Sequence, residues 1–215
     1  MSAISLLLLL PLLTSSLRPP PPPLLDRSSP VPLEQWFSQV VDHDSVRDGR
    51  TWSQRYWLSK EHYRPGGPSM LMIGGEGEAS PHWLVAGTLV EYARQQGAAL
   101  LVLEHRFYGR SRPVASTSVK NLSLLSSRQA LADLAYFISS MKTTSLPGPW
   151  VVVGGSYPGS LAGWLRLKYP HLVAGAVATS GPVAAKEDFV EYLEVSTRGP
   201  VLGSNTGALL LVLKI

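Results

Sequence analysis

The sequence predicts an α/β fold in which helices cover both faces of a mostly parallel β-sheet. Short apolar segments have the composition of strands that are buried on both faces, and they lie at residues 69–73, 98–103, 151–153 and 172–179. Segments with helical spacing alternate with these strands, and glycine-rich turns follow two of the strand ends. Alternation of this kind is typical of parallel sheets.

Two of the predicted helices have clear apolar faces. In residues 83–96 the apolar positions repeat every three or four residues, and Gly97 ends the pattern. In residues 126–141 one face carries Leu131, Leu134, Ala135 and Ile138. Nearer the amino terminus, an Asp-Gly turn followed by alternation over residues 51–58 predicts a hairpin.

Composition excludes several functional classes. The 215 residues include 19 Lys+Arg and 15 Asp+Glu, and the basic residues are scattered rather than clustered. Scattered charge without a recognition motif argues against nucleic-acid binding. The absence of cysteine excludes disulfides, thiolate metal sites and a cysteine nucleophile. Because the sequence has neither metal-ligand spacing nor a phosphate loop, we predict no metal and no cofactor.

The amino-terminal region predicts entry into the secretory pathway. Residues 6–13 form an apolar run that is too short to span a bilayer, and small residues follow it, which is typical of a signal peptide over residues 1–16. Residues 17–32 are proline-rich and predict a spacer. We expect a partial α/β domain over residues 33–198 and a divergent tail over residues 199–215. No membrane span is predicted.

The segment of residues 150–169 contains the main catalytic candidate, Ser156. A β-branched apolar run leads into Gly154-Gly155-Ser156, and helical spacing begins directly afterwards. A serine on a tight turn between a buried strand and a helix is typical of a nucleophile elbow. The alternative is a glycine-rich turn with a solvated serine. Pro158 departs from the motif, which has glycine two residues after the serine, and the sequence does not decide whether it distorts the elbow.

Two backbone segments are candidates for an oxyanion hole. The N–H of Tyr157, directly after the serine, would point toward a developing negative charge. The loop of Gly75, Glu76 and Gly77 follows an early strand, where this kind of fold places its second donor. A plain tight turn is the alternative for that loop.

A complete catalytic triad cannot be assembled from the sequence. His105 precedes the serine, whereas this architecture needs the order serine, acid, histidine, so we expect a packed, hydrogen-bonded histidine there. His171 follows the serine but would lie at the far end of the helix. The acids after the serine all lie beyond His171. Without its partners, Ser156 is a weak nucleophile.

Asn121 begins the sequence Asn-Leu-Ser, an N-glycosylation sequon in a predicted surface segment. Together with the predicted signal peptide, it favours a glycoprotein. An unused chance match is the alternative.

Five segments together resemble the prolyl carboxypeptidase and dipeptidyl peptidase family of serine peptidases. They are QRYW (54–57), MIGGEG (72–77), EHRFYG (104–109), LSSRQALADLAYF (125–137) and GGSYPGSLAGWLRLKYPH (154–171). The EHRFYG and LSSR forms are most similar to the thymus-specific branch of that family. Pro158, where the family has glycine or alanine, is a departure.

The resemblance implies an α/β-hydrolase core and a helical cap domain inserted later in the chain. On this basis the chain would contain only the N-terminal part of the sheet, without the cap domain and the last strands. Ser156 matches the family nucleophile, and the acid and histidine would lie in a C-terminal part that this chain lacks. The resemblance further implies an exopeptidase-like enzyme acting on peptides near proline in endosomes, lysosomes or the extracellular space. Antigen-peptide processing is implied for the thymus-specific branch.

Two main hypotheses follow; a third, an esterase or lipase on the same fold, would share the elbow but not the EHRFYG segment. The first is a serine peptidase of the secretory pathway whose nucleophile is Ser156. The second is a catalytically incompetent isoform that binds peptides or the complete enzyme, or that has no function. Cleavage preference and oligomeric state stay open.

Overall fold

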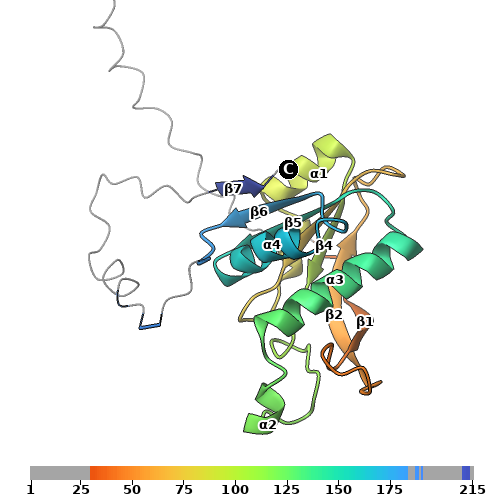
Figure 1. Cartoon of the computed structure of the whole chain (residues 1–215). Coiled ribbons are helices and arrows are strands. Elements are labelled where there is room, and N and C mark those ends of the chain that lie inside the picture. Colours follow the sequence, from red (N-terminus) through yellow and green to blue (C-terminus); the bar gives the residue numbers. More distant parts are fainter. Residues whose placement is uncertain (1–29, 184–186, 189, 191–209, 214–215) are drawn as a thin grey trace, which may run out of the picture.

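One mixed sheet runs through the molecule, with strands in the order β1-β2-β4-β3-β5-β6-β7 (Figure 1). The computed structural model describes residues 30–183, 187, 188, 190 and 210–213. The predicted signal peptide, most of the predicted spacer and most of the predicted tail lie outside these residues. The strands are β1 (Gln35–Val40), β2 (Thr51–Ser59), β3 (Ser69–Ile73), β4 (Ala99–Leu103), β5 (Trp150–Gly155), β6 (Gly175–Thr179) and β7 (Leu210–Leu213).

The centre of the sheet is parallel and its edges are antiparallel. Strand β3 pairs in parallel with both β4 and β5, and β5 pairs in parallel with β6. Strand β2 runs antiparallel to β4 and to β1, which forms the predicted hairpin. Strand β7 pairs antiparallel with β6 at the other end of the sheet. The predicted mostly parallel sheet is therefore present in β3, β4, β5 and β6.

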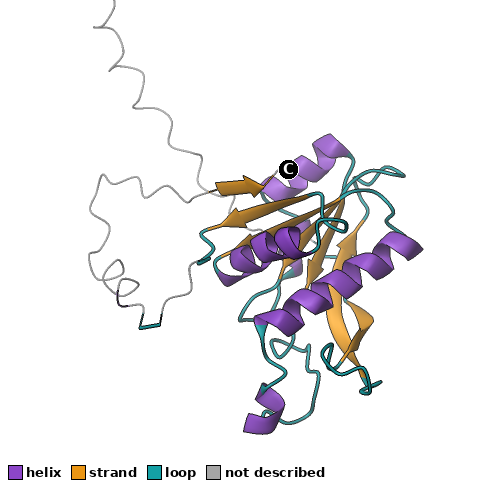
Figure 2. Ribbon diagram, in the orientation of Figure 1, coloured by secondary structure: helices purple, strands orange, loops and turns teal. Residues whose placement is uncertain are grey.

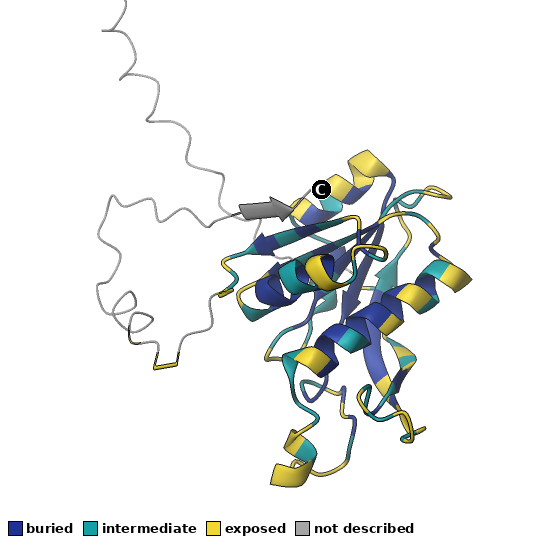
Figure 3. Cartoon of the chain, in the orientation of Figure 1, coloured by how far each residue is buried: buried dark blue, intermediate teal, exposed yellow. Residues whose placement is uncertain are grey.

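Helices lie on both faces of this sheet, as the alternation predicts (Figure 2). The helical elements are η1 (Pro81–Leu84), α1 (Thr88–Gln96), α2 (Val119–Leu122), α3 (Ser127–Thr144) and α4 (Tyr157–Lys168). Residues of α3 and α4 join the larger core cluster with Phe137, Trp150 and Leu161. Residues of η1 and α1 form a second cluster on the opposite face, with Leu84, Ala93 and Val102. The dark, buried strands lie between these layers in Figure 3.

Some element boundaries differ from the sequence prediction for local reasons. The helix expected at residues 83–96 is divided into η1 and α1, because Gly87 between them has φ 95°, outside helical geometry. The strand expected at residues 172–179 begins only at Gly175. Before it, Leu172 and Val173 donate backbone hydrogen bonds to the Tyr169 carbonyl and form a turn.

Glycines allow β5, α4 and the end of β6 to approach one another closely. A Cβ at Gly154 would overlap the backbone of Pro158 and lie 2.8 Å from Gly159 N. A Cβ at Gly159 would lie 2.7 Å from Thr179 O, and one at Gly181 would lie 2.7 Å from Ser160 N. Real Cβ atoms do not tolerate such contacts with backbone. The turn that carries Ser156 therefore requires glycine, which has no Cβ, at these three positions.

This close approach gives the first prediction. Gly154→Ala should lower the free energy of unfolding by about 3 kcal/mol or more, because overpacking against backbone cannot relax through a side chain. Urea unfolding monitored by circular dichroism measures the change.

The control is Gly163→Ala in helix α4, which packs against Gly154, because an added Cβ at Gly163 meets nothing within 4 Å. It should change stability by less than about 1 kcal/mol, in the stabilising direction. Equal effects of the two substitutions would contradict the close packing at Gly154.

Candidate active site

The candidate site lies at the carboxyl edge of the sheet between β3 and β5. The chain leaves β3 through α1 toward β4, and then returns through α3 past β3 to β5. Because the helices of the two connections lie on opposite faces, the loops after β3 and β5 diverge and leave a crevice between them. This crevice is where open α/β sheets bind ligands. The loop after β3 contains Gly75, and the loop after β5 contains Ser156.

Ser156 has the backbone of a strained turn between β5 and α4. Its φ of 59° and ψ of −132° are unfavourable for a residue with a side chain. The surrounding backbone holds it there: Ser156 N donates to Thr179 O at 2.9 Å, and Ser160 N donates to Ser156 O at 3.1 Å. The Ser156 side chain is exposed at the amino end of α4. A strained, exposed serine between a strand and a helix agrees with the predicted nucleophile elbow, and the catalytic role of Ser156 stays a prediction.

Pro158 fits this elbow. It lies in the first turn of α4, where a missing N–H removes no helical hydrogen bond. Its ring is buried against Gly75, at which a Cβ would lie 2.7 Å from the proline Cγ. Proline at this position and glycine across the crevice are therefore sterically complementary, which answers the question that the sequence left open.

Tyr157 is anchored by its hydroxyl. His105 Nδ1 lies 2.7 Å from Arg106 O, and since a carbonyl only accepts, Nδ1 carries the proton. His105 Nε2 then accepts from the Tyr157 hydroxyl at 3.0 Å. Burial lowers the pKa of His105, and burial with the nearby Glu76 carboxylate raises the pKa of Tyr157 to about 12. His105 is thus a packed, hydrogen-bonded histidine, as chain order predicted.

Glu104 holds the loop after β3 in place. Its carboxylate is fully buried and accepts from Ala79 N at 3.1 Å and from Arg110 N at 3.0 Å. It also pairs with the Arg55 guanidinium, at 2.6 and 3.1 Å, and accepts from Ser111 Oγ at 2.7 Å. Through these contacts one carboxylate joins β2 to the loops that follow β3 and β4.

Arg55 is the cation that balances this carboxylate. Burial alone would lower the pKa of Arg55, but hydrogen bonds to Glu104 and Glu78 outweigh it and raise the pKa further above its ordinary range. Its Nη2 lies 2.7 Å from Glu78 Oε1, on the loop after β3. The guanidinium also stacks on the Trp57 ring at 4.8 Å.

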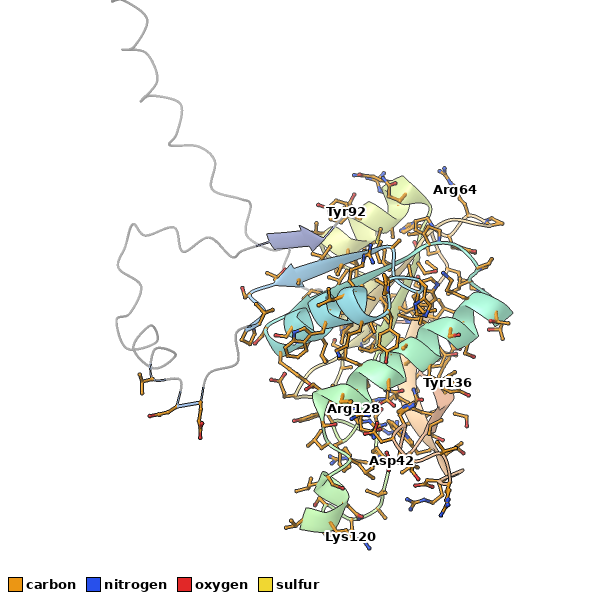
Figure 4. The ribbon with its side chains drawn as sticks, viewed as in Figure 1. Asp42, Arg64, Tyr92, Lys120, Arg128 and Tyr136 are labelled. Atoms are coloured by element: carbon orange, nitrogen blue, oxygen red, sulfur yellow. The ribbon has the colours of Figure 1, made fainter. Side chains whose placement is uncertain are left out.

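A second buried ion pair joins the loop after β4 to α3. Arg106 and Asp133 form two hydrogen bonds of 2.7 Å, and both side chains are almost completely buried. His43 Nε2 contacts the same carboxylate at 2.8 Å. Figure 4 shows the neighbouring end of this network, where Asp42 lies beside the start of α3 and accepts from Gln129.

The five histidines of the chain all lie in the described residues, and none of them forms a hydrogen bond with Ser156 there. His43 pairs with Asp133, His82 contacts Ser80, and both nitrogens of His105 are engaged. His62 follows β2, whose end pairs with the start of β4, so it lies at the opposite edge of the sheet. His171 follows α4, a 12-residue helix that separates it from the serine by roughly 18 Å.

Two hollows flank the elbow. One is a groove of about 510 Å³ between the loops after β3 and β5, with Met72, Trp83, Val153 and Pro158 among its largely apolar walls. The other holds about 210 Å³ beside Tyr157 and Tyr108. Gly75, Glu76 and Gly77 line the groove, and Glu76 lines both hollows.

Comparison with protein families identifies the chain. Residues 39–200 match the model of the serine carboxypeptidase S28 family. The chain belongs to this family. It is 47% identical over 165 residues to a Caenorhabditis elegans protein named as a serine protease, K12H4.7, covering 74% of this chain and 32% of that protein.

Vertebrate relatives agree with this assignment. The chain is 45% identical over 173 residues to the mouse thymus-specific serine protease, covering 78% of this chain and 34% of the relative. It is 40% identical over 163 residues to the human lysosomal Pro-X carboxypeptidase, covering 72% and 33%. The chain therefore spans about a third of the length of the relatives that it matches.

Solved structures confirm the fold class. The thioesterase domain from the curacin biosynthetic pathway aligns with a TM-score of 0.51 at 20% identity, over 79% of this chain and 53% of that domain. The peroxisomal α/β-hydrolase Lpx1 of Saccharomyces cerevisiae aligns with a TM-score of 0.52 at 12% identity, over 75% and 47%. The chain has a partial α/β-hydrolase fold.

The residues that support the site were not among those predicted from the sequence. Glu104, Arg55 and Asp133 are buried and paired, but their partners lie 27 to 49 residues away along the chain. A charged residue directly at the end of an apolar strand, as at Glu104, is the available signal. In the part of the chain that the structure describes, no group of His, Asp or Glu is arranged to hold a metal, and no helix is long and apolar enough to cross a membrane.

Glu104→Gln tests the support of the loop after β3. It should lower the free energy of unfolding by about 3 kcal/mol, because it leaves the buried Arg55 guanidinium without its main counter-charge. Glu78→Gln removes the exposed partner of the same guanidinium and should cost less than about 1 kcal/mol. Chemical denaturation of both variants gives the comparison, and similar losses would contradict a special role for Glu104.

The buried state of His105 predicts a pH dependence. The pKa of His105 in the folded chain is lower than its ordinary value of 6.5. At a pH between the folded and the ordinary pKa, the unfolded chain therefore binds more protons than the folded chain. Its contribution to stability is therefore complete above about pH 6.5 and is lost as the pH falls toward the folded pKa.

We expect wild-type stability to fall more steeply between pH 7 and pH 5 than that of His105→Gln. Thermal unfolding across this pH range measures both slopes. Parallel slopes would show that His105 does not titrate differently in the two states.

Proposed function

We propose that this chain provides the nucleophile and the oxyanion hole of a serine peptidase. The observation that carries the proposal is the strained backbone of Ser156, which three glycine-mediated contacts hold at the carboxyl edge of the sheet. Strain of this size persists where the surrounding structure determines it, and it is typical of functional sites. Family membership supports hydrolysis of peptides as the reaction.

In the proposed reaction, Ser156 Oγ attacks the carbonyl carbon of the scissile peptide bond. The oxyanion accepts from Tyr157 N–H and from a backbone N–H of the loop Gly75, Glu76 and Gly77, which lies across the crevice. The base that takes the serine proton would come from outside the 215 residues, because all five histidines have other positions. In a protein of the relatives' length it would belong to the remaining two thirds.

The groove beside Pro158 is a candidate for substrate binding. Its apolar walls suit a compact apolar residue such as proline, and the relative named lysosomal Pro-X carboxypeptidase supports a proline-related specificity. The same name and the signal-like residues 1–16 support an endosomal, lysosomal or extracellular location. A role in antigen-peptide processing, which the sequence resemblance to the thymus-specific branch implies, remains part of this proposal.

Asn121 remains a proposed glycosylation site. It lies in α2, half-buried, and its side-chain amide donates to Ser116 O at 2.9 Å. A glycan attached to the side-chain nitrogen would replace one of its two hydrogens, and the other could still donate to Ser116 O. If Asn121→Gln leaves the mobility of the chain expressed in a secretory cell unchanged, the sequon is unused.

The 215-residue chain alone should react slowly with a fluorophosphonate probe. General-base assistance contributes about 10² to 10⁴ in rate, and it is the missing component. We expect labelling at least about a hundredfold slower than that of a full-length relative, and no turnover of proline-containing peptides. In-gel fluorescence over time measures the rate.

The residual labelling should disappear in Ser156→Ala and persist in Ser139→Ala, which removes an exposed serine of α3. Rapid, Ser156-dependent labelling of the chain would contradict the missing base. Labelling that persists in Ser156→Ala would contradict the nucleophile.

A non-catalytic binding role is the second candidate, and the positions of the histidines favour it. Such a product would keep the groove and the fold but not turn substrate over. Secretion of a monodisperse 215-residue chain would support this role, whereas retention and degradation in the cell would argue against it.

A further inference from the structure

The hollow beside Tyr157 has a different chemistry from the apolar groove. Glu76, Tyr108 and Tyr157 line it together with the His105 ring and the hydroxyl-bearing Ser126 and Ser127. Its volume of about 210 Å³ is large enough for one small organic group. We call these residues the amine pocket.

Aromatic rings form one side of the amine pocket. The His105 ring lies 5.3 Å from the Tyr108 ring and 5.5 Å from the Tyr157 ring, both tilted toward edge-on contact. The His105–Tyr157 hydrogen bond fixes the orientation of the tyrosine. Aromatic faces held in this way attract cations through their quadrupole.

The charge of the pocket is negative. Glu76 is its one carboxylate, while His105 is kept neutral by burial and Tyr157 stays protonated. Arg106 and Asp133, two buried charges that act on the pKa of His105 in opposite directions, form their own ion pair. The lining of the pocket therefore contains one acidic side chain and neither lysine nor arginine.

We propose that the amine pocket binds a protonated primary amine of the peptide substrate. The ammonium group would donate to Glu76 and to the serine hydroxyls while its carbon chain contacts the tyrosine rings. This inference rests on the proposed function for its peptide ligand. Because Tyr157 directly follows the nucleophile and an extended residue spans about 3.5 Å, the amine would lie within about two or three residues of the scissile bond.

Two sources could supply this amine: the amino terminus of the peptide or a lysine side chain. An amino terminus bound this close to Ser156 would make the site an exopeptidase that removes short amino-terminal units. A lysine would instead set a side-chain preference. The two sources share one binding chemistry, and blocked peptides distinguish them.

Binding of benzylamine to the complete 215-residue chain tests the proposal directly. Benzylamine is a cation at pH 6, and benzyl alcohol is its neutral counterpart of nearly the same shape. We expect saturable shifts of the Tyr108 and Tyr157 amide resonances with benzylamine, and at least about tenfold weaker binding of benzyl alcohol, as expected for hydrogen bonds to a charged group. Equal binding of the two would overturn the proposal.

Two variants test whether Glu76 is the carboxylate that binds the amine. Glu76→Gln should weaken benzylamine binding by about tenfold, whereas Glu78→Gln should change it less than about twofold. Glu78 is on the same loop and exposed, but it pairs with Arg55 and lines only the other groove. Equal effects of the two substitutions would mean that benzylamine responds only to the overall negative charge of the loop, and would overturn the assignment to this pocket. The same spectra show whether each variant is folded.

Peptides then identify the source of the amine. The dipeptide amide Gly-Pro-NH₂ should bind and its N-acetyl form should not, if the amino terminus is the ligand. Binding of N-acetyl-lysine methylamide with the same Glu76 dependence would assign the pocket to lysine side chains. Absence of binding by both would overturn the proposal. Amine binding and Ser156-dependent labelling are measured in separate experiments on the wild-type chain, so the two proposals fail separately.

Discussion

The close backbone approach beneath Ser156 is the constraint on which the rest of the site depends. Gly154, Gly159 and Gly181 bring β5, α4 and the end of β6 together without intervening side chains. The Ser156 N–H and carbonyl are then both hydrogen-bonded within the turn, so no unsatisfied backbone group accompanies the strained φ. The serine hydroxyl is exposed as a consequence of this packing, before any substrate or base is considered.

Two buried ion pairs extend this constraint to the loops around the elbow. Glu104 with Arg55 fixes the loop after β3, and Arg106 with Asp133 fixes the loop after β4 against α3. Buried pairs of this kind add little net stability, because desolvation opposes their attraction. Their value here is geometric, since each carboxylate accepts several hydrogen bonds from loops that have few apolar residues to pack. The site is thereby preorganised on the side that this chain provides.

The sequence predicted the strands, the helices and the elbow because each leaves a local pattern. Continuous apolar runs mark β3, β4 and β5, and the change of period after Ser156 marks α4. The ion pairs leave no such pattern: Arg55 and Glu104 are 49 residues apart, and only the pairing of β2 with β4 brings them together. Pro158 could not be evaluated for the same reason, since its tolerance depends on Gly75 across the crevice. Chain order argued against His105 as the base, and the structure places both of its ring nitrogens in other contacts.

Residue-resolved hydrogen exchange of the 215-residue chain tests most directly whether this segment builds the elbow by itself. The Ser156 and Ser160 amides donate within the turn, so both should be protected to a similar degree as the Val152 amide in the centre of β5. Exchange of the Ser156 and Ser160 amides at the rate of an unstructured loop, while Val152 stays protected, would contradict the account. In that case the part of the relatives' length that this chain does not span would be needed to form the turn at Ser156.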